Sequence, residues 1–518
     1  MPTYQSPGVY VEEVAAGARP LAGVGTAIAA FVGLAEAGPF NRPTLVSNWT
    51  QFTNTFGAFV AGSYLAQSVY GYFMNGGGNC YIVRIGQDSG PSGPAPRSAR
   101  AKELAAAPTA QIGRLKATVI DPAVQPGEVS VQITDPGGDN PGADQFKVVV
   151  KRGGETVEEF DSASLGRGKQ NVVTMVNAGS KLINLEETSS GSLERLPNSE
   201  TALAAPPAAA ALPTTRLSAD DYVGDVAERS GFAGLEAVDE VTMLCVPDLM
   251  SAYQQGAIDL DTVQAVQTAM IAHCELMGDR VAILDAPPGF NAQQIKEWRV
   301  DKARYDSMYA TLYWPWIQTM NPMTGLLSYM PPSGHMAGIW GRNDDTRGVH
   351  KAPANEVVRG AVDLEINITR NEHDLLNPEG INCIRAFPGR GIRVWGARTL
   401  SSDPAWRYLN VRRLFNYLEE SILSGTNWVV FEPNDEALWA KIRRTIAAFL
   451  VMEWRAGALF GSTPDEAFYV KCDSETNPSE GIDAGQVVCE IGVAPVKPAE
   501  FVIFRLAQFS GGTSLVSE

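Results

Sequence analysis

The chain has 518 residues, of which 45% are hydrophobic and 19% are charged, a balance that excludes wholesale disorder. Because single cores stop growing well below this length, we expect roughly three folded units. The net charge of −17 repels phosphate backbones and argues against nucleic-acid binding. No apolar leader opens the chain and no apolar stretch approaches ~20 residues, so we expect no membrane insertion and synthesis and assembly in the cytoplasm.

The first twenty residues differ from everything that follows. Pro7-Gly8 marks a turn, a short β-prone run comes next, and residues 15–19 form a flexible stretch. The β-prone run consists of Val9, Tyr10, Val11, Glu12, Glu13 and Val14. It has no neighbouring strand with which to form a hairpin. We therefore expect it to join a sheet elsewhere in its own chain or in another molecule.

Residues 21–88 combine strand and helix patterns, and residues 89–215 then change character. In the first segment we expect strands at 27–34 and 80–85 and helices at 47–56 and 64–74. In the second, two stretches rich in Pro, Ser, Ala and Gly bracket alternating runs of β-formers. This pattern predicts an all-β domain, a small sandwich, inserted into a loop of the surrounding α/β domain.

The α/β pattern resumes over residues 216–365. We expect strands at 241–246, 281–284 and 309–316, and helices at 260–277 and 293–305. Residues 366–497 predict an α+β unit with one helix over 411–424 and a second with Asn434 as N-cap. The expected fold class is therefore α/β and α+β multidomain: an α/β middle domain with an inserted all-β domain, a C-terminal α+β domain, and extended strands at 1–20 and 498–518.

Motifs of enzyme chemistry do not occur in the sequence. There is no nucleophile elbow, phosphate-binding loop, dinucleotide fingerprint or metal-ligand spacing. We therefore expect no catalytic residue, no cofactor and no metal site. The alternative that stays open is an α/β hydrolase-like enzyme using an Asp/His pair near Asp285 or His335. Ser333 and His335 are interpreted as a turn that leads into a helix.

An arginine-rich segment inverts the sign of the local charge. Residues 385–413 hold seven arginines and a single acid, Asp403, in a chain that is acidic overall. Two interpretations stay open. The guanidinium groups form intramolecular pairs with carboxylates elsewhere in the chain, or they contact an acidic partner surface.

A second β-prone run lies near the end of the chain. It contains Phe501, Val502, Ile503, Phe504 and Arg505, and both of its faces are largely apolar. Such a strand must be covered or it aggregates. Terminal strands at the two ends of the chain can complete the sheets of other copies, and an exchange that does not close produces a helical filament. From composition, the expected hinges of these arms are residues 15–19 and 492–498.

These features resemble the contractile tail sheath proteins of phages and phage-tail-like injection systems. The resemblance is carried by Tyr4-Gln-Ser-Pro-Gly-Val-Tyr-Val-Glu-Glu-Val14, Pro331-Pro-Ser-Gly334, Lys351-Ala-Pro-Ala-Asn355, Gly391-Ile-Arg-Val-Trp-Gly-Ala-Arg-Thr399, Val411-Arg-Arg413 and Pro498-Ala-Glu-Phe501. It spans nearly the whole chain apart from about residues 90–215.

The resemblance implies a non-enzymatic subunit of a contractile sheath. Such subunits form a homo-oligomer, a helical stack of sixfold rings around an inner tube protein, with baseplate and cap proteins as further partners. Their arms link neighbouring subunits, the insert faces outward, and the C-terminal domain faces the tube. Contacts with the tube or a neighbour are expected from Arg398, Arg412, Arg413, Lys441, Arg443 and Arg444. Another phage-tail-like component, a tube or baseplate protein, is the remaining alternative.

Overall fold

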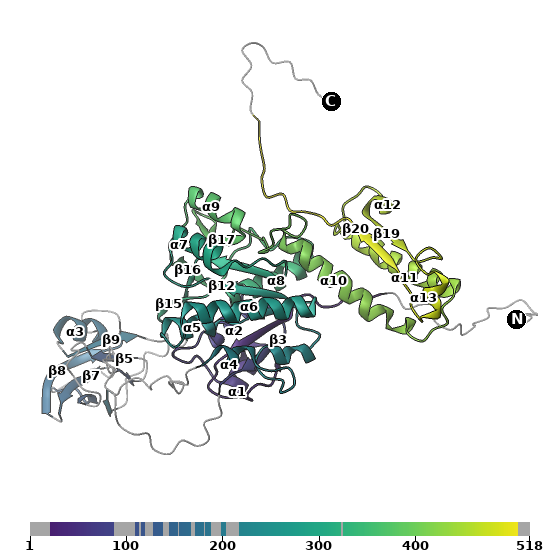
Figure 1. The fold of residues 1–518 in the computed structure, drawn as a ribbon. Coiled ribbons are helices and arrows are strands. Elements are labelled where there is room, and N and C mark those ends of the chain that lie inside the picture. The colour runs from purple at the N-terminus through teal and green to yellow at the C-terminus, as the bar shows by residue number, and fades with distance from the viewer. Residues whose placement is uncertain are drawn as a thin grey trace, which may run out of the picture. The chain divides into compact units, whose positions relative to one another are not determined.

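The computed structural model (Figure 1) describes residues 21–86, 109–112, 115–119, 128–137, 145–153, 155–166, 171–180, 182–187, 198–203, 217–322 and 325–505. Two compact units make up the chain, residues 1–88 with 212–518 and residues 89–211. The protein is thus a mixed α/β chain with several sheets. The finer five-part division expected from the sequence stays a prediction.

The larger unit is built on an eight-stranded sheet with the order β18-β17-β13-β12-β11-β1-β3-β2. The six inner strands run parallel and the two outer ones are antiparallel to their neighbours. Its strands are β1 (Ala29–Gly33), β2 (Thr44–Val46), β3 (Cys80–Arg84), β11 (Met243–Cys245), β12 (Val281–Asp285), β13 (Ala310–Trp314), β17 (Ile381–Phe387) and β18 (Gly391–Val394). β17 and β18 fall within 366–497, the range expected for the C-terminal unit, but pair into this sheet.

Helices cover both faces of the sheet, which is why β1, β12 and β13 are buried at every position. Successive residues of a strand therefore enter different cores: Ala30 and Val32 lie in one cluster, Ala29 and Phe31 in the other. The first core is shared with α4 (Ala219–Val223), α5 (Asp248–Gln254), α6 (Leu260–Met277) and α7 (Ala292–Glu297). The second is shared with α1 (Trp49–Phe56), α2 (Leu65–Met74) and α8 (Ser333–Arg347).

Smaller elements complete this part of the chain. They are η1 (Ala233–Ala237), η2 (Trp298–Ala303), α9 (Arg370–Leu376), η3 (Asn377–Glu379) and an antiparallel sheet of β15 (Leu327–Met330), β14 (Ile317–Met320) and β16 (Ala361–Leu364). The helix expected over 293–305 is α7 followed by η2, a π-helical stretch. The i→i+5 spacing of a π-helix places Trp298 and Ala303 on one side, and both are buried.

The unit of residues 89–211 packs two antiparallel sheets around one described core. The first contains β10 (Ser199–Ala202), β6 (Val129–Thr134), β7 (Gln145–Arg152) and β8 (Glu155–Ser164), and the second β4 (Thr109–Ile112), β5 (Leu115–Val119) and β9 (Ile183–Glu187). The expectation of an all-β unit is wrong for α3 (Val172–Gly179). There the Asn171 side chain caps the helix, and Val172 and Val176, four residues apart, both enter the core.

The C-terminal part contains two long helices and a two-stranded antiparallel sheet. Its elements are α10 (Leu409–Thr426), η4 (Asn427–Val429), α11 (Glu436–Arg455), α12 (Pro464–Ala467), β19 (Phe468–Lys471), α13 (Ser479–Asp483) and β20 (Glu490–Val493). α10 spans both regions (Figure 1), because Leu409 lies in a core of the large sheet and Leu418 packs with α11.

The N-cap of α11 is Asp435, whose carboxylate accepts a hydrogen bond from Leu438 N at 2.8 Å. The expected cap, Asn434, is therefore wrong by one residue. Its Oδ1 instead accepts from Trp439 Nε1 at 2.8 Å. Both residue types are good helix caps, so the sequence pattern could not separate them, and the extended backbone of Asp435 (φ −138°, ψ 172°) decides.

Candidate functional site

The last described residues, 501–505, leave the fold without joining any sheet of the described chain. The side chains of Phe501, Val502, Ile503 and Phe504 are 73%, 69%, 79% and 86% exposed. Four consecutive large apolar residues facing water form a surface that soluble monomers avoid. This segment, named the C-arm here, therefore needs a cover that the described chain does not supply.

A cluster of donors around Glu500 fixes the base of the C-arm. Its Oε1 accepts from Arg398 Nε and from Asn377 Nδ2, each at 2.9 Å, and its Oε2 accepts from Arg398 Nη2 at 2.5 Å. Tyr408 OH lies 3.4 Å from Oε2. Burial would raise the pKa of Glu500, but the hydrogen bonds from Arg398 and Asn377 hold it below its usual value. We call this cluster the Glu500 clasp.

The C-arm separates from its own fold later in the chain than the sequence predicts. Gly492 lies within β20, Ala494 N donates to Ala467 O at 2.8 Å, and Val496 N donates to Ala458 O at 3.2 Å. The hinge expected at residues 492–498 is therefore wrong, because backbone hydrogen bonds and then the clasp hold this stretch. The chain leaves its own fold only after Glu500.

Three of the arginines expected at a tube or neighbour contact are buried within the fold. They are Arg398, Arg412 and Arg413, which are 8%, 2% and 4% exposed. Arg413 forms two bonds to the carboxylate of Asp344, at 2.9 and 2.5 Å. Arg412 pairs with Glu419 at 3.2 Å and lies over the Trp406 and Tyr309 rings. For these three arginines the intramolecular interpretation holds, and it argues against the expected contact.

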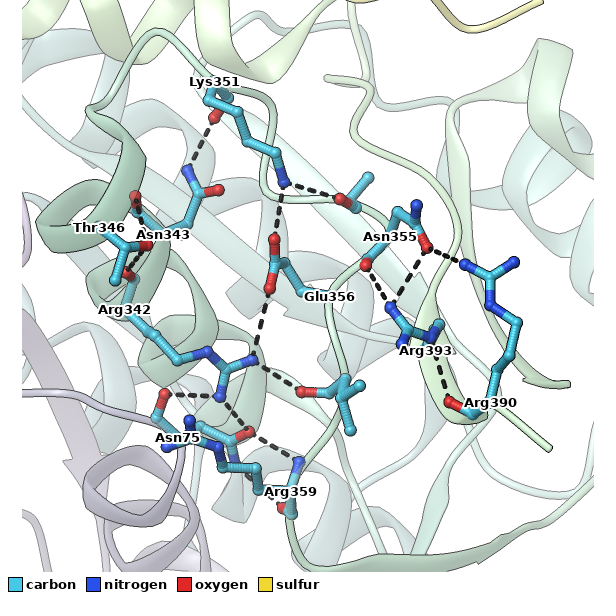
Figure 2. Close-up of polar contacts among 12 residues, drawn as sticks. Asn75, Arg342, Asn343, Thr346, Lys351, Asn355, Glu356, Arg359, Arg390 and Arg393 are labelled. Atoms are coloured by element: carbon cyan, nitrogen blue, oxygen red, sulfur yellow. Dashed lines mark hydrogen bonds and ion pairs between the residues drawn. The ribbon is translucent and has the colours of Figure 1, made fainter.

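Two more arginines of this segment hold the loop between α8 and β16 (Figure 2). Asn355 adopts a left-handed backbone (φ 59°), and its carbonyl accepts from Arg393 Nη1 at 2.7 Å. Its Oδ1 accepts from Arg390 Nη2 at 3.3 Å, and Arg393 Nε donates to Arg390 O at 3.1 Å. Asn tolerates this backbone conformation better than other non-glycine residues.

The rest of the loop is tied to α8 and to the end of α2 (Figure 2). Lys351 Nζ contacts Glu356 Oε1 at 2.8 Å, and Arg342 Nη2 donates to Val357 O at 2.7 Å. Arg342 Nη1 also reaches the Asn75 carbonyl at 3.0 Å, while Asn75 Oδ1 accepts from Arg359 N at 2.9 Å. The loop that carries part of the sequence resemblance is thus a fixed structural element.

The basic residues of α11 are more accessible. Lys441 Nζ lies 3.9 Å from the centre of the Trp428 ring, and Arg443 donates to the Cys472 carbonyl. Arg444 is exposed. Arg443 and Arg444 line a groove of about 560 Å³ between α11 and β19, which is also lined by Asp465, Phe468 and Val470. Among the described strands only β20 pairs with β19, so one edge of β19 has no partner strand within the described part of the chain.

The expected N-terminal arm, Val9, Tyr10, Val11, Glu12, Glu13 and Val14, lies outside the described residues. Its contacts with other subunits stay a prediction. The same holds for the tube or neighbour contact of Lys441, Arg443 and Arg444.

In the larger unit, the chain itself closes the place where open α/β sheets bind ligands. Ligands usually sit at the carboxyl ends of the strands where the strand order reverses, here between β1 and β11. Asp248 fills this crevice: its carboxylate accepts from Leu34 N, Ser63 Oγ, Tyr64 N and Leu65 N. Burial raises the pKa of Asp248 to about 6 although these hydrogen bonds act in the opposite direction. Asp248 therefore caps α2.

Asp285 and Ser333, which lie among the residues named for the enzyme alternative, also have a capping role. Asp285 is the last residue of β12, the strand next to β11. Asp285 accepts from Ser333 N at 2.9 Å and from Ser333 Oγ at 2.6 Å, which caps α8. Burial raises the pKa of Asp285 to about 7 and lowers that of His335 to about 4. Asp285, Ser333 and His335 are at most 4% exposed, so a substrate cannot reach them. His335 packs against Gly71 of α2.

No three His, Cys, Asp or Glu side chains among the described residues are grouped to hold a metal ion. Nor is any helix in the described part of the chain both long and apolar enough to cross a membrane.

Comparison with known families identifies the fold. The phage tail sheath protein central domain matches residues 219–400, and the phage tail sheath C-terminal domain matches residues 401–509. The chain belongs to the phage tail sheath family. Sheath proteins of this family are structural proteins, so the predicted family and its non-enzymatic character are confirmed.

Curated relatives and solved structures extend the likeness. The tail sheath protein of Burkholderia phage BcepMu is 22% identical over 96% of this chain and 95% of its own length. The tail sheath proteins of Vibrio phage KVP40 and Salmonella phage ViI are 26% and 25% identical, and the chain spans only 35% and 39% of their lengths. The helical sheath of the anti-feeding prophage in its contracted state has a TM-score of 0.59 at 24% identity, covering 98% of this chain and all of that one. This last likeness shows a sheath-like fold.

Sequence reasoning missed the Glu500 clasp and the two capping aspartates. Glu500 is 123 residues from Asn377 and 102 from Arg398, and no local pattern links them. Asp248 and Asp285 were detectable in part, because each comes just after a predicted buried strand.

Proposed function

We propose that the chain is the structural subunit of a contractile sheath, which polymerises around an inner tube and contracts to drive the tube through a target envelope. The observation that carries the proposal is the exposed apolar C-arm, residues 501–505, on a base that the Glu500 clasp holds. Membership of the tail sheath family supports it. The assembly is a helical stack of sixfold rings in a phage tail or phage-tail-like particle, with baseplate and cap proteins at its ends.

The terminal arms link subunits by strand exchange. A two-stranded sheet such as β19–β20 is marginal alone, and the free edge of β19 presents unpaired backbone groups to an incoming strand. The groove beside that edge is lined by Arg443 and Arg444. The N-terminal arm carries Glu12 and Glu13 in its β-prone run. Opposite charges favour the N-terminal arm of a neighbour as the strand added to β19.

The C-terminal domain faces the inner tube, and the insert faces outward. Of the basic residues expected at the tube, Arg398, Arg412 and Arg413 are committed to internal carboxylates. The contact therefore depends on the basic face of α11, and Arg444 is its most accessible member.

Contraction is a rigid-body rotation of subunits that the arms keep connected. The buried Arg413–Asp344 pair and the fixed loop before β16 make the body rigid. At ~25 cal/mol per Å², an extra ~400 Å² of apolar burial per subunit releases on the order of 10 kcal/mol. Summed over a long sheath, this drives the tube without nucleotide.

Removal of residues 501–518 tests the proposal. The truncated subunit keeps the clasp and every described helix and strand, so we expect it to fold with the melting temperature of the full chain. We expect electron microscopy to find no contractile sheaths of this variant, whereas the full chain forms them. Contractile sheaths of normal length from the truncated chain would contradict the role of the C-arm.

A further inference from the structure

The loop between α10 and α11 carries an apolar tip that the described part of the chain leaves largely uncovered. Val430 and Phe431 are 64% and 103% exposed, the latter being as accessible as an isolated side chain. The backbone of Phe431 is in the left-handed region (φ 68°), which a bulky residue adopts only at a cost in free energy. Within the described part of the chain, no contact of the Phe431 side chain offsets this cost.

The tip is held in place. Asn434 Oδ1 accepts from Trp439 Nε1 at 2.8 Å, and Asn434 Nδ2 donates to the Gln486 carbonyl at 2.9 Å. Glu432 N donates to Val429 O at 3.1 Å. Phe431 is therefore a fixed projection, and the exposed carboxylate of Glu432 lies next to it in the chain.

A cavity of about 850 Å³ lies at the base of the C-arm. Part of its wall is apolar, formed by Ala352, Trp395, Ala397, Val496 and Pro498. Five cations also line it, Arg347, Lys351, Arg370, Arg385 and Lys497, against two acids, Asp374 and Glu500. Of these cations, Lys351 is already paired with Glu356. Arg398 already neutralises Glu500, while Arg370 and Lys497 are exposed and form no ion pair within the described chain. The cavity suits an aromatic side chain that is accompanied by a carboxylate.

The tip and the cavity lie at opposite ends of α10. Tyr408, the N-cap of α10, lines the cavity, and the tip loop begins at Asn427, directly after its last residue. Eighteen helical residues span about 27 Å, so a subunit cannot fill its own cavity with its own tip. A contact between the tip of one copy and the cavity of the next joins two different surfaces of the chain. Such head-to-tail contacts can repeat from copy to copy and produce an open helical polymer.

We propose that Phe431 of one subunit inserts into this cavity of a second copy of the chain, with Glu432 facing Arg370 and Lys497. The inference rests on the proposed assembly into a polymer and adds a contact separate from the arms. The left-handed backbone aims an otherwise unpartnered ring, and the acid beside it matches the excess of positive charge around the cavity.

Photo-crosslinking of the assembled polymer tests the contact. The full chain is prepared with p-benzoylphenylalanine at position 431, which is fully exposed, so folding is unaffected. After illumination, we expect mass spectrometry to find crosslinks to cavity residues within 347–355, 370–397 or 496–502 of another copy. The same analogue at position 276, an exposed leucine of α6, is the control and should not label these segments. Crosslinks from position 431 to a tube protein or to another face of the chain would overturn the inference, as would no crosslink.

Charge exchange provides a second test. We expect Glu432→Lys to reduce the fraction of chain in sedimentable polymer roughly tenfold or more, with the melting temperature of the subunit unchanged. Adding Lys497→Glu and Arg370→Glu in the same chain should restore assembly, because every contact then pairs opposite charges again. Failure of the combined variant while the unmodified chain polymerises would refute this contact alone. An unmodified chain that forms no polymer would instead refute the proposed function.

Discussion

The guanidinium group of Arg413 and the carboxylate of Asp344 form a two-bond ion pair that joins α10 to α8, with side chains only 4% and 5% exposed. Arg413 also donates to the Thr26 carbonyl at 3.0 Å and lies 4.7 Å from the centre of the Trp340 ring. The pair thus links the C-terminal helices to the large sheet.

Removing one partner leaves the other as a buried, uncompensated charge. We expect Arg413→Ala to lower the free energy of unfolding by about 3–5 kcal/mol, measured by chemical denaturation. Arg455→Ala, at an exposed position of α11, is the control and should leave stability unchanged. Equal effects of the two variants would show that the pair does not join the two helices energetically.

The second prediction concerns the Glu500 clasp. Glu500→Gln keeps the side-chain shape but removes the charge that faces Arg398, so we expect a loss of about 1–3 kcal/mol at this contact. Hydrogen exchange at Ala494 and Val496, whose amides donate to backbone carbonyls just before the clasp, should accelerate, and sheath assembly should fall. Glu480→Gln, on the exposed surface of α13, should change neither property. Unaltered exchange in Glu500→Gln would mean that the base of the C-arm is held elsewhere.

Because the pKa of Glu500 is lowered in the folded chain, the clasp has a defined pH dependence. Its stabilisation is complete above the ordinary pKa of a glutamate and is lost as pH falls through the lowered folded value. We expect exchange at Ala494 and Val496 to accelerate on acidification, after correction for the intrinsic effect of pH on exchange. The Glu500→Gln variant should lack this transition, and a transition of equal size in the variant would assign it to another group.

A third prediction uses the buried carboxyl of Asp285. Burial raises its pKa from 3.8 to about 7, so between these values the folded chain keeps a proton that the unfolded chain has released. This group therefore makes stability fall as pH rises, by about 1.4 kcal/mol per pH unit. Burial of His335 and His273 lowers their pKa values to about 4. These two groups therefore make stability rise with pH between about 4 and ~6.5, opposite to the effect of Asp285.

The measurement is therefore a difference between two chains. Melting temperatures of the unmodified chain and of Asp285→Asn are compared from pH 5 to 8. We expect the unmodified chain to lose stability relative to the variant as pH rises to about 7, and the difference then to level off. A difference that does not vary with pH would show that Asp285 has an ordinary pKa.

The fourth prediction addresses the basic face of α11. Arg443→Glu with Arg444→Glu reverses the charge of the groove beside β19. We expect folded subunits that no longer assemble on the tube, scored by electron microscopy of mixtures with purified tubes. Arg455→Glu, on the same helix but outside the groove, should assemble normally. Normal assembly of the double variant would remove α11 from the set of inter-subunit surfaces.

Most long elements of the fold were predictable because their signal is local. The helix at 260–277 was expected with the observed bounds, since its apolar residues recur at helical spacing between an aspartate cap and a terminal glycine. Strands of the parallel sheet were detected as continuous apolar runs, because both faces are covered. α3 was missed because its valines and threonine favour strands by intrinsic propensity. The Asn171 cap and the burial of one side of the segment in the core stabilise the helix instead.

The candidate site was likewise predictable from the sequence only in part. The apolar character of residues 501–504 is a property of the sequence, and their exposure follows because no described strand of the chain is placed beside them. Whether the arginines of 385–413 faced a partner or the interior could not be deduced, since Arg413 finds its acid 69 residues away and Arg398 finds its acid 102 residues away.

The family, the main helices and strands and the two β-prone ends follow from the amino-acid sequence alone, because they depend on patterns of nearby residues. The folded arrangement was needed to establish which charges are paired internally and where the C-arm leaves its own fold. It was also needed to place the exposed Phe431 and the cationic cavity at opposite ends of α10. These features arise when segments far apart in the chain meet, and their free energies depend on burial, which sequence spacing does not encode.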